Sequence, residues 1–206
     1  MIKEKYLILC KKGLEMHDDK QLVESYLSNL VQELQSAPRE PVLQMIDVLR
    51  KARAEKKHIF TFGNGGSSAT ADIMGVAFQK GVLRDSPLPG RQNLRFISLT
   101  ANMPVFSAWA NDSAYEVVFS EQLKSLADAG DVAIGISASG NSPNVLNGFK
   151  TAREMGLTTL GLTGFQGGKM KALCDICYVH PSNDMERIED AALIVNHLLL
   201  HALRQA

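Results

Sequence analysis

Two short stretches rich in glycine, serine and asparagine could bind an anion. They are Gly63-Asn-Gly-Gly-Ser-Ser68 and Ser137-Ala-Ser-Gly-Asn-Ser-Pro143, and each lies between an apolar run and a segment with helical spacing. Glycines let the backbone approach a ligand closely, and a helix N-terminus favours negative charge. Neither stretch contains Lys or Arg, which excludes the lysine-bearing P-loop, and the third glycine of a dinucleotide fingerprint would fall at Ser68. We expect a phosphate monoester held by hydroxyls and backbone amides, and the alternative is that both stretches are only helix caps.

Short apolar runs alternate with helical patterns from His58 onward, which predicts an α/β fold. Segments with helical spacing separate most of these runs, as in βαβ units with a parallel sheet and helices on both faces. Ligands in such folds bind beyond the carboxyl ends of the strands. The expected strands are Ile59–Phe62, Phe96–Leu99, Val132–Ile136, Thr159–Leu162 and Ile176–Val179.

Helical patterns flank this region on both sides. Gln21–Gln35 and Pro41–Glu55 predict two N-terminal helices, so we expect a helical extension over 1–56, packed on a core domain over 57–206. Asp184–Leu203 predicts a long final helix, and its part Ala191–Leu203 is apolar nearly all round. Such a helix is buried in the core or between subunits, so we expect an oligomer.

The composition excludes several classes of protein. Lys+Arg and Asp+Glu number 22 each, so the chain lacks a bulk field that would attract nucleic acid or an anionic membrane. No apolar run approaches the length of a transmembrane helix. The three cysteines and the absence of a signal peptide predict a cytoplasmic protein. Cys174-Asp-Ile-Cys177 has redox or half-zinc spacing, but without a second such pair we interpret both cysteines as packing residues.

Four motifs together resemble the sugar isomerase (SIS) domain family, and most closely its phosphoheptose (sedoheptulose 7-phosphate) isomerases. The resemblance implies a flavodoxin-like three-layer αβα domain with a five-stranded parallel sheet. It also implies a homotetramer and a phosphosugar site between subunits. The motifs are Phe62-Gly-Asn-Gly-Gly-Ser-Ser68, Ala110-Asn-Asp-Ser-Ala-Tyr-Glu116, Ile136-Ser-Ala-Ser-Gly-Asn-Ser-Pro-Asn144 and Leu160-Gly-Leu-Thr-Gly-Phe-Gln-Gly-Gly-Lys169.

The resemblance also implies roles for residues of the two loops. One group would hold the phosphate, another would line the sugar, and Ser67 would cap the first helix and face the phosphate. The phosphate group comprises Ser137, the Ala138 backbone, Ser139 and Ser142, and the sugar group comprises Asn64, Gly65, Gly66, Asn111 and Asp112.

The catalytic set implied by the family is only partly present. The general-base Glu aligns with Ala77, and a zinc-binding His one turn earlier aligns with Ile73. The resemblance places a zinc-binding Gln at Glu189 and a catalytic His at His197. Because two usual ligands are replaced by hydrocarbon side chains, we expect no metal and no other cofactor.

The sequence therefore leaves two alternative functions. The first is an aldose–ketose isomerase acting on sedoheptulose 7-phosphate or a similar sugar phosphate, with Glu189 as base and His197 as acid. The second is a non-catalytic phosphosugar-binding module that regulates or binds a partner protein, favoured by Ala77 and Ile73. His197 has its own alternative, a core histidine bonded to a neighbouring subunit.

Overall fold

The sheet confirms the predicted fold class. The computed structural model describes residues 18–83 and 93–205, so Cys10 and the first residues lie outside the described part. The strands β1 (His58–Gly63), β2 (Arg95–Ser98), β3 (Val132–Ile136), β4 (Thr158–Thr163) and β5 (Ile176–Val179) are all parallel. Their order is β2-β1-β3-β4-β5, the flavodoxin-like order. The chain changes direction across the sheet between β1 and β3, which is where such folds bind ligands.

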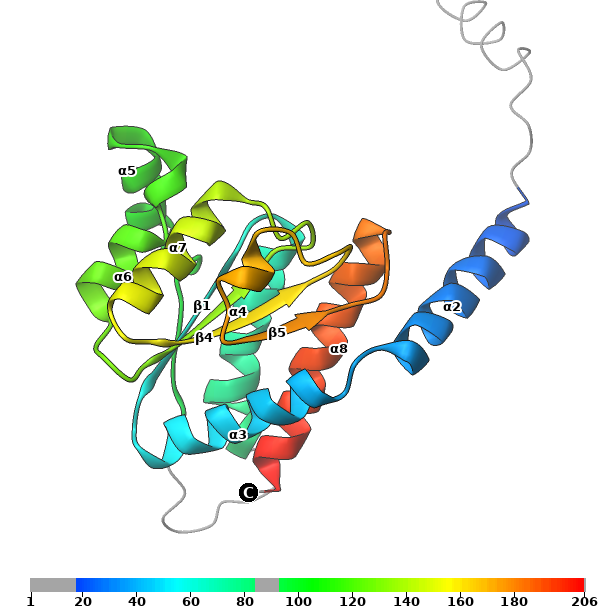
Figure 1. Cartoon of the computed structure of the whole chain (residues 1–206), viewed down its shortest axis with the longest axis horizontal. Helices are drawn as coiled ribbons and strands as arrows, with labels where there is room; N and C mark the ends of the chain where they lie inside the picture. The colour runs from blue at the N-terminus through cyan, green and yellow to red at the C-terminus, as the bar shows by residue number, and fades with distance from the viewer. Residues whose placement is uncertain (1–17, 84–92, 206) are drawn as a thin grey trace, which may run out of the picture. The chain divides into compact units, whose positions relative to one another are not determined.

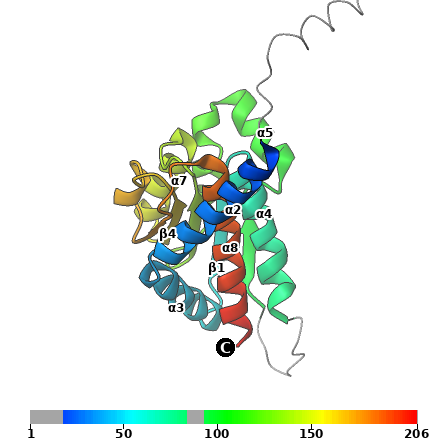
Figure 2. The same ribbon diagram turned by 90° about the vertical axis from the view of Figure 1, so that its right-hand side faces the viewer.

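Helices cover both faces of the sheet, as the alternating pattern predicts (Figure 1). One face is covered by α3 (Glu40–Ala54), α4 (Gly66–Gln79) and α8 (Met185–Arg204), whose apolar residues form one core with the sheet. The other face carries α5 (Met103–Asp112), α6 (Ser120–Leu126) and α7 (Pro143–Glu154). Figures 1 and 2 show α4 and α8 side by side. Short 3-10 turns lie at Gly81–Leu83, Tyr115–Val117 and Met170–Ala172.

The chain divides into two compact units, residues 1–35 and 36–206. Met45, Leu49 and Ala52 of α3 are buried in the core of the second unit. The expected domain boundary at residue 56 stays a prediction. The described part of the first unit is most of α2 (Asp19–Ser36), which has no buried residue.

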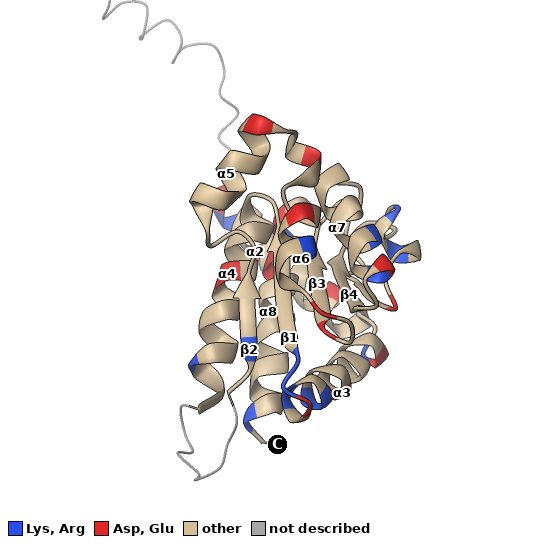
Figure 3. Cartoon of the chain, turned by 90° about the vertical axis from the view of Figure 1, so that its left-hand side faces the viewer, with Lys and Arg blue, Asp and Glu red and all other residues tan. Residues whose placement is uncertain are grey.

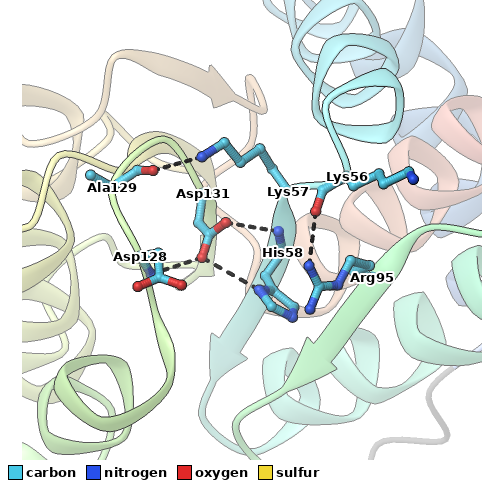
Figure 4. A network of polar contacts seen from close by, with 7 residues as sticks. All are labelled: Lys56, Lys57, His58, Arg95, Asp128, Ala129 and Asp131. Atoms are coloured by element: carbon cyan, nitrogen blue, oxygen red, sulfur yellow. Dashed lines mark hydrogen bonds and ion pairs between the residues drawn. The ribbon is translucent and has the colours of Figure 1, made fainter.

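A buried carboxylate holds the starts of β1 and β3 together, at the edge opposite the two glycine-rich loops (Figure 4). Asp131 is 2% exposed, and its carboxylate accepts from the backbone N–H of His58 at 2.8 Å and of Asp128 at 2.9 Å. The His58 imidazole lies 3.6 Å from the same carboxylate, and the Lys57 ammonium donates to the Ala129 carbonyl at 2.8 Å. These contacts give His58 a structural role.

The surface agrees with the neutral composition. Figure 3 shows acidic and basic residues interspersed over the described elements seen from that side. Among residues 18–83 and 93–205, no helix combines the length and apolarity that a membrane crossing requires.

Candidate functional site

The turn from β1 into α4 depends on close packing at glycines. A Cβ on Gly63 would lie only 2.8 Å from the Ile136 carbonyl oxygen, so the two neighbouring strand ends could not approach as they do. Gly65 has a φ of 54°, in the left-handed region that favours glycine. A Cβ on Gly66 would collide with the carboxylate of Glu189. The start of α4 therefore faces the β3 loop on one side and Glu189 on the other.

The turn from β3 into α7 brings serine hydroxyls together. Ser137 is 4% exposed, and its hydroxyl lies 3.2 Å from the hydroxyl of Ser142. Ser139 accepts a 3.3 Å hydrogen bond from the backbone N–H of Asn141. Pro143 is the first residue of α7, where a missing N–H costs no helical hydrogen bond. This loop thus places three hydroxyl groups near one helix N-terminus.

A third loop packs directly against this turn. A Cβ on Gly168 would lie 2.5 Å from the Ser139 carbonyl oxygen and 2.6 Å from that of Gly140. Met170 donates its backbone N–H to the Gly140 carbonyl at 3.0 Å, and Lys169 donates to the Asn141 side chain at 3.1 Å. The segment after β4 therefore fixes the position of the serine-rich turn.

Several backbone amides at the two turns remain available to a ligand. Within residues 18–83 and 93–205, these N–H groups donate to no protein acceptor. Unpaired amides at adjacent helix N-termini are suited to a phosphate group. They belong to Gly66 and Ser67 at the start of α4, and to Ala138, Ser139 and Ser142 before α7.

A pair of side-chain amides joins the two turns. Asn64 donates to the Asn144 oxygen at 2.9 Å, and Asn144, which is 1% exposed, donates back to the Asn64 oxygen at 2.8 Å. The Tyr115 hydroxyl donates to the same Asn64 oxygen at 2.9 Å. Asn144 also accepts from the backbone N–H of Val145 at 2.9 Å. The side chain of Asn64 is therefore held in place by two other elements.

Glu189 lies at the predicted site, in the first half of α8. Its carboxylate packs against Gly66, and it lines a small cavity with Ser67, Thr70 and Ala138. The structure thus brings Glu189 together with residues of both turns.

His197 lies elsewhere on α8. It is exposed and lines a cavity of about 690 Å³ together with Ile73, Ala77 and Leu200. Glu189 and His197 are eight residues apart on one helix, so their Cα atoms are separated by about 12 Å along its axis. A single chain therefore places these two residues in different cavities.

Asn111 and Asp112 form the end of α5 and are both exposed. Asn111 donates to the Asp112 carboxylate at 2.7 Å. In the described part of the chain, no hydrogen bond joins these two residues to either glycine-rich turn.

Comparisons with known proteins agree with this geometry. Residues 24–164 match the family described as SIS domain, which is more than half of the chain. The chain belongs to the SIS domain family.

Several similar proteins are named phosphoheptose isomerase. The chain is 39% identical over 161 residues to the phosphoheptose isomerase of Aliarcobacter butzleri, covering 78% of this chain and 82% of that one. It is 39% identical over 164 residues to the phosphoheptose isomerase of Paramagnetospirillum magneticum, covering 80% and 83%. The structure of the phosphoheptose isomerase from Neisseria gonorrhoeae matches with a TM-score of 0.82 and 27% identity, covering 91% of this chain and 99% of that chain.

The zinc that some SIS proteins bind does not fit the residues of this chain. At the positions aligned with zinc ligands, Ile73 and Ala77 have no donor atoms. Among the residues that the structure describes, no group of three or more His, Cys, Asp or Glu side chains could hold a metal ion.

Sequence reasoning missed Asn144 and Tyr115 as site residues. Both stand inside the motifs that carry the SIS resemblance, but neither was assigned a role. An amide one residue after the proline of a helix start was the available signal, because a side chain there lies beside the turn that the helix begins. Asn64 was predicted to line the sugar, but its hydrogen bonds with Asn144 and Tyr115 were not predicted.

Proposed function

We propose that this protein is a phosphosugar isomerase that interconverts an aldose and a ketose, with sedoheptulose 7-phosphate or a similar sugar phosphate as substrate. The observation that carries the proposal is the contact between the Glu189 carboxylate and Gly66, at the start of the helix whose first amides are unpaired. It puts a proton acceptor beside an anion-binding turn. The relatives named phosphoheptose isomerase support the same reaction.

The phosphate would be held by groups that carry no formal charge. The hydroxyls of Ser137, Ser139 and Ser142 and the unpaired amides donate hydrogen bonds, and the N-termini of α4 and α7 add their dipoles. Holding the phosphate fixes the position of the sugar chain relative to Glu189. Positioning of this kind converts proton transfer into an intramolecular step.

Isomerisation moves a proton between C1 and C2 of the sugar through an enediol. A base removes the proton from one carbon, and an acid protonates the neighbouring carbon or its oxygen. Glu189 is our candidate base, because it lines the cavity that Ser67 and Ala138 also line. A positioned base contributes about 10²–10⁴-fold to such a reaction.

His197 would act as the acid from a second copy of the chain. Within one chain it lies too far along α8 to reach the carbon next to the one that Glu189 serves. Apolar side chains on α4 and α8 are exposed in the single chain, including Ile73 at 39%, Val76 at 66% and Leu198 at 51%. Burying them between copies would be favourable. We therefore include a homotetramer with shared sites in the proposal.

A non-catalytic phosphosugar-binding protein is the second candidate. Ala77 and Ile73 support it, because they line the cavity of His197 with hydrocarbon where the family has a base and a metal ligand. Both candidates would bind phosphate through the same hydroxyls and backbone amides of the two turns. Both also fit a cytoplasmic protein with free thiols at Cys174 and Cys177.

Turnover of sedoheptulose 7-phosphate by the purified protein separates the two candidates. We expect wild-type turnover, a loss of about 10²–10⁴-fold in kcat for Glu189→Gln, and little change for Glu186→Gln, an exposed glutamate one turn earlier on α8. Turnover that Glu189→Gln leaves intact would remove Glu189 from the role of base. Binding without turnover would favour the second candidate, and Ala77→Glu would then test whether the family's base restores activity.

A further inference from the structure

Two thiols lie over Gly161 of β4, that of Cys177 on β5 and that of Cys174 in the turn before β5. A Cβ on Gly161 of β4 would lie 2.6 Å from the Cys174 sulfur and 3.2 Å from the Cys177 sulfur, so both sulfurs cover this glycine. Cys177 is also the partner of Gly161 in the sheet register. Both residues are half-buried. They are therefore neighbouring thiols on two half-buried residues.

The two sulfurs differ in character. Hydrogen bonding to Cys177 raises the pKa of the Cys174 thiol, and burial adds to this effect. The same hydrogen bond lowers the pKa of the Cys177 thiol, and the positive charge of Lys171 lowers it further. Cys177 is thus suited to act as the attacking thiolate and Cys174 as the resolving thiol.

Met170 connects this dithiol to the serine-rich turn. Its terminal methyl group would lie 3.2 Å from the same Cβ on Gly161, so it packs beside the two sulfurs. Its backbone N–H donates to the Gly140 carbonyl at 3.0 Å, inside the turn that carries Ser139 and Ser142. A change in the distance between the sulfurs would therefore alter the packing of Met170, which is hydrogen bonded to the turn.

We propose that Cys174 and Cys177 form a thiol–disulfide exchange site for small disulfides such as oxidised glutathione, and that closing the internal disulfide weakens phosphate-ester binding at residues 137–142. The Cys177 thiolate attacks one sulfur of the oxidant, which forms a mixed disulfide and releases one thiolate. Cys174 then loses its proton and attacks the Cys177 sulfur, which releases the second thiolate. The protein loses two electrons and two protons, and the oxidant becomes two thiols.

Mass spectrometry of the full chain tests the thiol chemistry. Cys10 is replaced by Ser so that only the pair can react, and trypsin cleaves after Lys171 and Arg187 to release one peptide that holds both cysteines. After treatment with oxidised glutathione, we expect this peptide to lose two hydrogen atoms. Cys174→Ser should instead retain glutathione on Cys177, and Cys177→Ser should react more slowly.

Calorimetry with sedoheptulose 7-phosphate tests the coupling, which rests on the proposed function. We expect affinity to fall by about fivefold or more on oxidation, and to recover on reduction. In Cys174→Ser without oxidant, affinity should equal that of the reduced protein. A peptide that stays reduced in the folded protein while the unfolded chain is oxidised would overturn the exchange site. Equal affinities of the oxidised and reduced protein would overturn the coupling. A reduced protein that binds no sugar phosphate would refute the proposed function and the coupling together, whereas the mass change would still decide the thiol chemistry.

Discussion

Removing the Asn144 side chain should loosen the connection between the two anion-binding turns. Asn144→Ala deletes the two hydrogen bonds with Asn64, at 2.9 and 2.8 Å, and the 2.9 Å bond from the Val145 backbone N–H. The Val145 N–H is buried and has no other acceptor among the described residues. Asn64 is half-buried, and it keeps its bond from Tyr115.

The magnitude follows from which groups lose their partners. A buried N–H left unpaired costs about 1–3 kcal/mol, whereas water can partly replace the bond lost at Asn64. We expect Asn144→Ala to lower the free energy of unfolding by about 2–3 kcal/mol. For a chain of this size that is a fall of about 4–12 °C in Tm. Sugar-phosphate affinity should fall as well, because Asn64 is no longer held toward the site.

Urea unfolding and calorimetry measure the two effects. Asn147→Ala is the matched control, since Asn147 lies nearly one turn further along α7 and makes one exposed hydrogen bond, to the Glu116 carbonyl at 3.1 Å. It should cost less than about 1 kcal/mol and leave affinity unchanged. If the two variants unfold at the same urea concentration and bind equally well, the bridge between the turns does not have the role that we assign to it.

Three further predictions concern Tyr178, Asn196 and Gly66. Burial raises the pKa of Tyr178 to about 12, above its ordinary 10.0. As pH rises, the unfolded chain therefore loses this proton before the folded protein does. The free energy of unfolding should fall by about 2–3 kcal/mol between pH 10 and pH 12. In Tyr178→Phe, denaturation curves across this pH range should no longer show this fall in the free energy of unfolding. The same pH dependence in the variant would show that Tyr178 is not its cause. Asn196 is fully buried, and its side-chain amide has no partner in the described residues. Asn196→Leu should therefore raise the free energy of unfolding by about 1–2 kcal/mol, measured as a higher urea midpoint. A lower midpoint would show that the amide is paired. Gly66→Ala should displace the Glu189 carboxylate and lower turnover at least about tenfold, because a positioned base contributes that much or more. In a Glu189→Ala background the same substitution should have little further effect, and a full additional loss there would argue against the contact.

The strands could be predicted from sequence because each is a short apolar run bounded by polar turns. Two of the five, Val132–Ile136 and Ile176–Val179, have the predicted bounds, and the others differ by one residue at each end. The packing of α3 could not be predicted in the same way. The pattern of α3 is that of any amphipathic helix, and only the packing of Met45 and Leu49 assigns it to the core.

The two glycine-rich turns were predictable where the backbone itself makes them. Gly65 and Ser142 stand at turns whose residue types already indicate a tight approach and a helix start. Contacts between distant segments were not predictable in this way. The pairing of Asn64 with Asn144 spans 80 residues, and no local sequence pattern indicates it.

The interlocking of Gly140 with Gly168 has a consequence for how the chain could diversify. There is no room for even a methyl group between these turns, so the phosphate-binding turn is preorganised. A ligand therefore loses little of its binding free energy in ordering that turn. The donors it offers are largely main-chain groups, which no side-chain substitution removes. Descendants of such a protein could therefore exchange one sugar for another by altering the rim of the site, while the anchor for the ester stays the same.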